Sequence, residues 1–241
     1  MSERITILQL YPRDMNIYGD WGNTLTLKRR LEWRGYEVNL LEYNPGDTFP
    51  SDVDIIVGGG GQDSGQARIG DDLLAIGPTL KRLANEGVPM LVICGLYQQF
   101  GHFFKTKDGE IIEGIGILDV ETYGSDTRMI GNIVTKSDEF GDIVGYENHS
   151  GQTVLGSSAT PLARVILGAG NNDHDGHEGA RYHNVIGTYL HGSVLPKNPA
   201  VADFLISMAI KRRFGSDTLK PLNVAHDYTE QARQVAMKRP R

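Results

Sequence analysis

The chain has 241 residues, of which 24 are Lys or Arg and 30 are Asp or Glu, giving a formal net charge of −6 at pH 7 with 39% hydrophobic residues. This composition is typical of a globular protein and excludes a disordered chain. The longest apolar stretch, over residues 88–97, is about ten residues long, whereas a membrane-spanning helix needs about 20, so we expect no membrane span. The N-terminus leads directly into a strand pattern, and we expect no signal peptide.

The predicted elements alternate between strands and helices over the first 104 residues. Strands are expected at residues 4–10, 36–43, 54–57 and 88–93, and helices at residues 23–34, 72–86 and 95–104. This order predicts βαβ units that form a parallel sheet covered by helices on both faces. Residues 110–190 are rich in Gly, Thr, Val and Ile and predict several shorter, partly antiparallel strands.

The C-terminal part of the chain differs in charge from the rest. A final amphipathic helix is expected at residues 200–214, and residues 229–237 could form one more. Residues 197–241 carry nine Lys and Arg against four Asp and Glu, whereas the preceding part is acidic. We therefore expect one domain over residues 1–215 and a basic C-terminal tail over residues 216–241. An acidic body argues against nucleic-acid binding, and the tail could either contact a protein partner or form a solvated helix.

The single cysteine is a candidate nucleophile. Cys94 follows the buried strand at residues 88–93 and precedes a helix that begins at Gly95. Such a turn exposes the thiol at the carboxyl edge of the sheet, and the N-terminus of the helix favours the thiolate. The alternative is a buried structural cysteine. In either case one cysteine excludes an internal disulfide and a Cys-rich zinc site, and it is compatible with the cytoplasm.

A thiol nucleophile needs a base, and His191 is the strongest candidate among seven histidines. It ends the strand pattern at residues 184–192, so its imidazole would be presented in a turn at the edge where α/β sheets place their sites. The 97 positions between Cys94 and His191 mean that the two can meet only through the tertiary fold. The alternative is an ordinary surface histidine.

Three motifs in this order resemble class I (triad-type) glutamine amidotransferases, in particular their cobyric-acid-synthase-like branch. They are Gly-Gly-Gly-Gly-Gln-Asp at residues 58–63, Cys-Gly-Leu-Tyr-Gln at residues 94–98 and Gly-Thr-Tyr-Leu-His-Gly at residues 187–192. The resemblance covers residues 4–215 and implies a three-layer α/β fold with a mostly parallel central sheet. Within the branch, the loops at residues 145–151 and 170–172 are similar to those of the amidotransferase subunit of lipid II isoglutaminyl synthase.

The resemblance also implies an activity and a partner. The chain would hydrolyse L-glutamine and deliver ammonia to a Mur-ligase-like subunit, in a heterodimer that amidates D-glutamate in the peptidoglycan precursor lipid II. No cofactor is expected in this chain, because ATP and Mg²⁺ would be held by the partner ligase. The alternatives are an amidotransferase subunit of another synthase, such as one that amidates a corrinoid, a cysteine hydrolase or peptidase of the same fold, and a non-catalytic subunit.

Roles for individual residues follow from the same resemblance. Cys94 would attack the amide carbon, and His191 would transfer the protons. The amides of Gly95 and Gly60 would form the oxyanion hole. Arg128 would bind the glutamine α-carboxylate, unless it is a surface arginine without a role, and Gln98 would lie near the substrate pocket. A phosphate cradle is the alternative for the glycine loop, but no Gly-Lys-Ser/Thr follows it.

One position departs from most triad-type relatives, which carry Glu two residues after the histidine. Here this position is Ser193. The resemblance therefore implies either a Cys94–His191 dyad or a carboxylate from elsewhere, and we expect the partner subunit to insert it. In that case the chain alone would orient His191 poorly.

Two other signals have ordinary explanations, and one histidine remains a second candidate. Asp14, Asn16 and Asp20 are expected to cap the first helix. The loop at residues 171–179 is rich in His, Asp and Asn and could hold a metal, but its composition favours a hairpin loop, so no metal site is expected. His149 lies in a Gly/Asn/Ser turn and is the second candidate for a histidine near the glutamine pocket.

Overall fold

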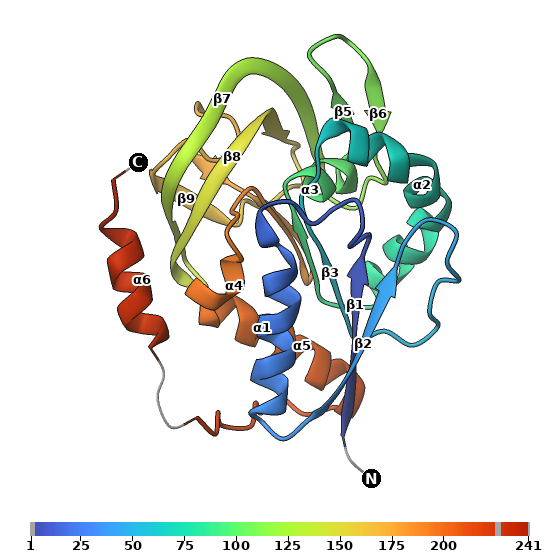
Figure 1. The fold of residues 1–241 in the computed structure, drawn as a ribbon, viewed down its shortest axis with the longest axis vertical. Coiled ribbons are helices and arrows are strands. Elements are labelled where there is room, and N and C mark those ends of the chain that lie inside the picture. The colour runs from blue at the N-terminus through green and yellow to red at the C-terminus, as the bar shows by residue number, and fades with distance from the viewer. Residues whose placement is uncertain (1–2, 225–227, 241) are drawn as a thin grey trace.

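A computed structural model describes residues 3–224 and 228–240 (Figure 1). The strands are β1 (Arg4–Leu10), β2 (Glu37–Tyr43), β3 (Ile55–Gly58), β4 (Met90–Ile93), β5 (Phe103–Lys105), β6 (Ile111–Glu113), β7 (Val120–Ser137), β8 (Gly141–Leu155), β9 (Ala163–Leu167), β10 (His177–Glu178), β11 (Ala180–Tyr182) and β12 (Val185–Thr188). The helices are η1 (Ile17–Gly19), α1 (Trp21–Glu32), α2 (Asp63–Asn85), α3 (Gly95–Phe100), α4 (Val194–Lys197), α5 (Pro199–Phe214) and α6 (Thr229–Met237).

A six-stranded sheet in the order β11-β12-β4-β3-β1-β2 forms the centre of the fold. All its pairings are parallel except that of the edge strand β11 with β12. Helices α1 and α5 pack on one face of this sheet, while α3, with α2 against it, packs on the other (Figure 1). Strands β3, β4 and β12 are buried along their whole length, as expected of parallel strands covered on both sides. The predicted α/β architecture is confirmed.

A second sheet holds the strands in the order β10-β9-β7-β5-β6, with β8 also paired to β7. Most of its pairings are antiparallel, as the sequence predicted for residues 110–190. The prediction of short strands is wrong for β7 and β8, which have 18 and 15 residues. Their pairing is interrupted by an irregularity between Gly124 and Met129, which lets so long a ribbon bend around the core.

Two helix boundaries also differ from the prediction. Helix α2 begins at Asp63, nine positions earlier than expected, and its first turn includes Gly65, where a Cβ atom would lie 3.0 Å from the carbonyl oxygen of Asp14. Helix α3 ends at Phe100, and the chain continues from Phe103 as a strand.

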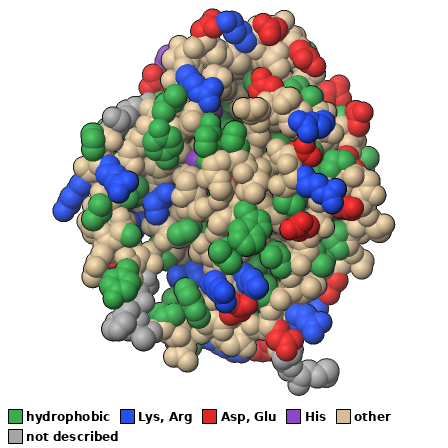
Figure 2. Space-filling view, viewed as in Figure 1, with side chains coloured by type: hydrophobic (Ala, Val, Ile, Leu, Met, Phe, Trp, Pro, Cys, Tyr) green, Lys and Arg blue, Asp and Glu red, His purple; other side chains and the backbone are tan. Residues whose placement is uncertain are grey.

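The C-terminal segment packs back onto the body of the protein. Helix α6 forms where the sequence suggested it, and it lies against α4 and β8 (Figure 1). The side-chain amide of Asn132 donates to the carbonyl oxygen of Ala236 at 3.1 Å, and Arg233 donates to the carbonyl oxygen of Asp142 at 2.6 Å. In the space-filling view, acidic side chains gather along the top and right and are nearly absent from the left, where α6 lies (Figure 2). No helix among the described residues is both long and apolar enough to cross a membrane.

Candidate active site

Cys94 lies in a strained turn between β4 and α3. Its backbone has φ 49° and ψ −104°, in the positive-φ range that residues other than glycine rarely adopt. Two hydrogen bonds hold it there: its amide donates to the carbonyl oxygen of Thr188 at 2.8 Å, and its own carbonyl accepts from the amide of Gln98 at 3.0 Å. This is the strand–turn–helix geometry expected from the sequence, and it places the thiol at the carboxyl edge of the parallel sheet.

His191 lies beside Cys94 because the strands that carry them are neighbours. Strand β12 runs parallel to β4, with Thr188 paired to Ile93, and His191 follows three residues after this pair. A Cβ atom built on Gly60 would lie 2.8 Å from Cε1 of His191 and 3.1 Å from Cβ of Cys94. The two side chains therefore flank Gly60, and the fold brings together the three positions that the sequence singled out.

The electrostatics of the imidazole follow from this proximity. Burial lowers the pKa of His191, but the neighbouring Cys94 thiolate and the Asp20 carboxylate outweigh burial and raise it above the ordinary histidine value. Nε2 of His191 has no partner with hydrogen-bond geometry among the described residues. This nitrogen is therefore available for proton transfer.

Asp20 is a member of this group that the sequence analysis assigned to helix capping. It does occupy the N-cap position of α1, but its side chain makes no capping hydrogen bond. Instead Oδ2 accepts from the amide of Gly60 at 2.8 Å, and Oδ1 lies 3.3 Å from Nδ1 of His191. The chain itself thus places a carboxylate beside the histidine, whereas the sequence favoured one inserted by the partner subunit. The missed signal was position: Asp20 lies in the loop after β1, whose carboxyl end meets the same sheet edge.

The two amides assigned to the oxyanion hole have different surroundings. Gly95 is the first residue of α3, where an amide has no partner within the helix. The amide of Gly60 is engaged by Asp20 and could serve an oxyanion only after that bond breaks. The amide nitrogen of Gly61 lies 3.1 Å from an ideal Cβ position on Gly95 and donates no hydrogen bond among the described residues.

A chain of polar contacts connects Arg128 to the site. Tyr18, in η1, sets its ring edge-on to His191 at a centroid distance of 4.9 Å. Asn148 donates to the Tyr18 hydroxyl at 2.8 Å, and Nε of Arg128 donates to Oδ1 of Asn148 at 2.8 Å. Arg128 lies in the irregular part of β7 and is exposed. The guanidinium is therefore at the rim of the site. Its two terminal nitrogens make no hydrogen bond to the described residues.

Gln98 lies behind the nucleophile turn. Its side-chain oxygen accepts from Nε2 of Gln66 at 2.7 Å, and its nitrogen donates to the Tyr189 hydroxyl at 3.1 Å. Both ends of the amide are thus engaged by buried side chains. This arrangement ties the Gln98 side chain to buried neighbours behind the turn.

His149 is buried and unsuited to act as a base. Its ring stacks on Tyr189 at 3.6 Å, and Nδ1 lies 2.9 Å from the carbonyl oxygen of Gly151. Burial, more than the nearby charges, lowers its pKa to about 3, so it stays neutral at physiological pH. Of the two candidate histidines, only His191 is placed to exchange a proton with Cys94.

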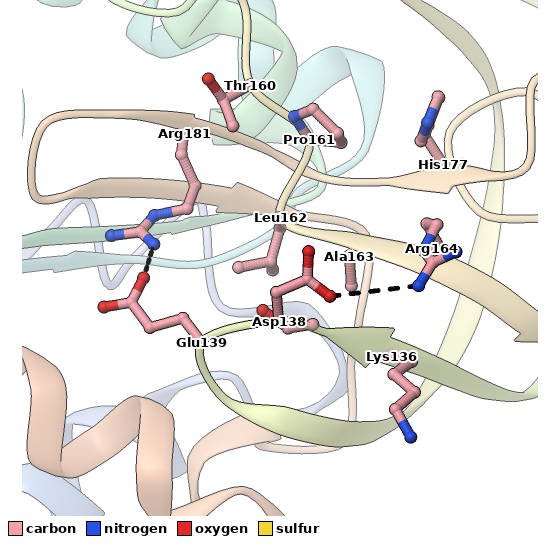
Figure 3. Close-up of a pocket in the computed structure, with 11 residues that line it drawn as sticks. Lys136, Asp138, Glu139, Thr160, Pro161, Leu162, Ala163, Arg164, His177 and Arg181 are labelled. Atoms are coloured by element: carbon pink, nitrogen blue, oxygen red, sulfur yellow. Dashed lines mark hydrogen bonds and ion pairs between the residues drawn. The ribbon is translucent and has the colours of Figure 1, made fainter.

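The remaining polar features do not extend the site. The loop before β10 is the hairpin connection from β9, and the described residues contain no cluster of three His, Cys, Asp or Glu that could hold a metal. A cavity of about 330 Å³ lies on the second sheet (Figure 3). Its charges largely pair with each other, Arg181 with Glu139 and Arg164 with Asp138, and none of the residues discussed above lines it.

The model of the CobB/CobQ-like glutamine amidotransferase domain matches residues 6–199. The chain belongs to this family, and it is a glutamine amidotransferase. It is 40% identical over 98% of its length to a protein of Staphylococcus aureus (strain N315), lipid II isoglutaminyl synthase (glutamine-hydrolyzing) subunit GatD, of which the match covers 96%. It is 37% identical over 90% of its length to the GatD subunit of Streptococcus pneumoniae (strain ATCC BAA-255 / R6), of which the match covers 85%.

Solved structures agree on the fold. A structure described as a glutamine amidotransferase superposes with a TM-score of 0.57 at 16% identity, covering 84% of this chain and 98% of that one. A second glutamine amidotransferase, from Thermotoga maritima, gives a TM-score of 0.52 at 14% identity, covering 96% of this chain and 93% of that one. At this identity the likeness supports the α/β architecture alone.

Proposed function

We propose that this chain is the glutamine-hydrolysing subunit of a lipid II isoglutaminyl synthase and acts in the cytoplasm, with Cys94 as nucleophile and His191 as general base and acid. The observation that carries the catalytic part is the placement of both side chains against Gly60 at the carboxyl edge of the parallel sheet. The choice of synthase is supported by the near-complete coverage of two GatD relatives.

The reaction is an acyl transfer. The Cys94 thiolate attacks the side-chain amide carbon of glutamine, and the carbonyl electrons move to oxygen, where backbone amides of Gly95 and the glycine loop stabilise them. The C–N bond then breaks, and protonated His191 donates to the leaving ammonia. Water, deprotonated by His191, hydrolyses the thioester, which releases glutamate and regenerates the thiol.

The charged end of the substrate binds at the rim of the site. Arg128 can grip the α-carboxylate of glutamine through its two terminal nitrogens, because Asn148 engages only Nε. Gln98 supports the nucleophile turn from behind. A Mur-ligase-like partner holds ATP and Mg²⁺, receives the ammonia and amidates D-glutamate of lipid II.

An isotope experiment tests this proposal. The chain is mixed with a Mur-ligase-like partner, ATP, Mg²⁺, lipid II and glutamine labelled with ¹⁵N at the side-chain amide. We expect one labelled nitrogen in lipid II by mass spectrometry. Glutamine hydrolysis without transfer to lipid II, but with transfer to a corrinoid acceptor, would support the alternative synthase. Absence of both hydrolysis and labelling of Cys94 by a glutamine-like chloroketone would indicate a non-catalytic subunit.

A further inference from the structure

We propose that Asp20 is the positioning residue for His191, supplied by the start of the first helix in place of the Glu that most triad-type relatives carry two residues after the histidine. This inference rests on the proposed function, since it assigns Asp20 a part in the glutaminase reaction. It makes the catalytic group complete within one chain, as Cys94, His191 and Asp20.

Burial is the first support. Asp20 is 1% exposed and His191 is 0% exposed, so bulk solvent does not hydrate either side chain. An unpaired carboxylate in such a place costs several kcal/mol, and it is retained only where hydrogen-bond donors face it. The donors here are the amide of Gly60 and the Nδ1 position of His191.

The contact also determines the tautomer. A carboxylate can only accept a hydrogen bond, so Nδ1 of His191 must carry the proton. The lone pair of the neutral ring is then on Nε2, the nitrogen without a partner among the described residues. The 3.3 Å separation of Nδ1 and Oδ1 is long for a hydrogen bond, and we expect it to shorten when His191 becomes charged during the reaction.

Ser193 links the start of α1 to the turn that carries His191. Its hydroxyl donates to the carbonyl oxygen of Gly19, the residue before Asp20, at 2.8 Å. A Cβ atom on Gly22, in the first turn of α1, would lie 2.2 Å from Oγ of Ser193. The start of α1 therefore packs directly against Ser193. The same close packing brings Asp20 to His191.

The second carboxylate oxygen of Asp20 also binds the glycine loop. Since Oδ2 holds the amide of Gly60, the loop and the histidine are tied to one carboxylate. The amides that remain free to stabilise an oxyanion are then those of Gly95 and Gly61. Asp20 thus positions the base and the loop together.

The decisive variant is Asp20→Asn, which keeps the size and removes the charge. Asp14→Asn is the matched control, because Asp14 lies in the same loop and pairs with Arg68 at 3.0 Å, outside the site. With the partner complex, we expect glutamine hydrolysis by Asp20→Asn to fall about 10–100-fold through kcat, the loss of one charge-assisted hydrogen bond, and Asp14→Asn to match the wild type. Equal rates for wild type and Asp20→Asn would overturn the proposal and return the role to a partner carboxylate.

A second readout does not depend on glutamine. The rate of Cys94 alkylation by iodoacetamide is measured against pH in the wild type, Asp20→Asn, Asp14→Asn and His191→Ala. The titratable groups around His191 are Cys94, Asp20, Tyr18 and His149, and only Asp20 changes. Because the carboxylate stabilises the imidazolium, its loss should shift the upper step of the profile, at which the imidazolium beside the thiolate loses its proton, to lower pH by about one to two pH units. An Asp20→Asn profile identical to wild type contradicts the proposal.

The wild-type protein provides a test that does not need a stable Asp20→Asn variant. A histidine Nδ1 proton bonded to a carboxylate gives a strongly downfield resonance, assigned here by its loss in His191→Ala. We expect that resonance in the wild-type chain, and its absence would overturn the proposal even if Asp20→Asn does not fold. A wild-type chain that shows this resonance and the thiolate–imidazolium profile, yet hydrolyses no glutamine with its partner, would contradict the proposed function and leave the Asp20 contact intact.

Discussion

Replacing Gly60 by alanine should misalign the nucleophile and the base without removing any chemical group. The new Cβ would lie 2.8 Å from Cε1 of His191, 3.1 Å from Cβ of Cys94 and 3.1 Å from Cγ2 of Ile17. Ordinary contacts of a Cβ begin near 3.4 Å, so the imidazole must move by at least about 0.6 Å. A displacement approaching 1 Å at a reacting centre costs on the order of 100-fold in rate, or about 2.7 kcal/mol of barrier.

The assay is glutamine hydrolysis by the partner complex, with kcat and KM measured separately. We expect kcat to fall about 10–100-fold in Gly60→Ala, while ammonia-dependent amidation by the partner is unchanged. Thermal unfolding should show a loss of about 1–3 kcal/mol from overpacking. Gly70→Ala is the control, because a Cβ there meets nothing within 4 Å and the residue lies in α2. Wild-type kcat in Gly60→Ala would refute the idea that Cys94 and His191 react across this glycine.

Two further predictions concern the nucleophile and the substrate-binding arginine. Cys94→Ser should abolish glutamine-dependent amidation and labelling by a glutamine-like chloroketone, while the partner still uses added ammonia; retained glutaminase activity in this variant would contradict the mechanism. Arg128→Ala should raise KM for glutamine about 10–100-fold with a small effect on kcat, since a charge-assisted contact contributes about 1.5–3 kcal/mol. Arg164→Ala is its control, because Arg164 is also exposed but lines the separate cavity on the second sheet. A KM that changes equally in both variants would refute the assignment.

The sequence predicted the fold and the proximity of Cys94 and His191 because both depend on local patterns. The buried strand before Cys94 and the strand before His191 are both short apolar runs that the sequence shows directly. The carboxyl ends of parallel strands meet at one edge of the sheet. The sequence alone therefore predicted that Cys94, His191 and the glycine loop lie close together. Helix α6 was also found, from its polar composition after Pro221.

The contact of Asp20 with His191 escaped prediction because it forms only in the tertiary fold. An Asp before a helix is ordinarily a cap, and nothing in the local sequence distinguishes Asp20 from Asp14. What distinguishes them is a contact across 171 positions of the chain, which depends on how closely α1 packs against Ser193. The engagement of the Gly60 amide and of both ends of Gln98 likewise follows from side-chain packing, which a residue pattern does not contain.

The buried Glu178 should make the stability of this fold fall as pH rises. Burial raises its pKa to about 8 from an unfolded value of 4.5, although it accepts bonds from the Tyr189 amide and the Thr188 hydroxyl, just before His191. Since the folded state holds the proton more tightly, this contribution is complete below about pH 4.5 and is lost as pH rises through about 8, at up to roughly 1.4 kcal/mol per pH unit. His149, with its lowered pKa, acts in the opposite direction below pH 6.5.

The measurement is therefore the difference in urea unfolding free energy between wild type and Glu178→Gln from pH 5 to 8, with exposed Glu113→Gln as control. A difference that does not change with pH would contradict a protonated Glu178 in the folded protein.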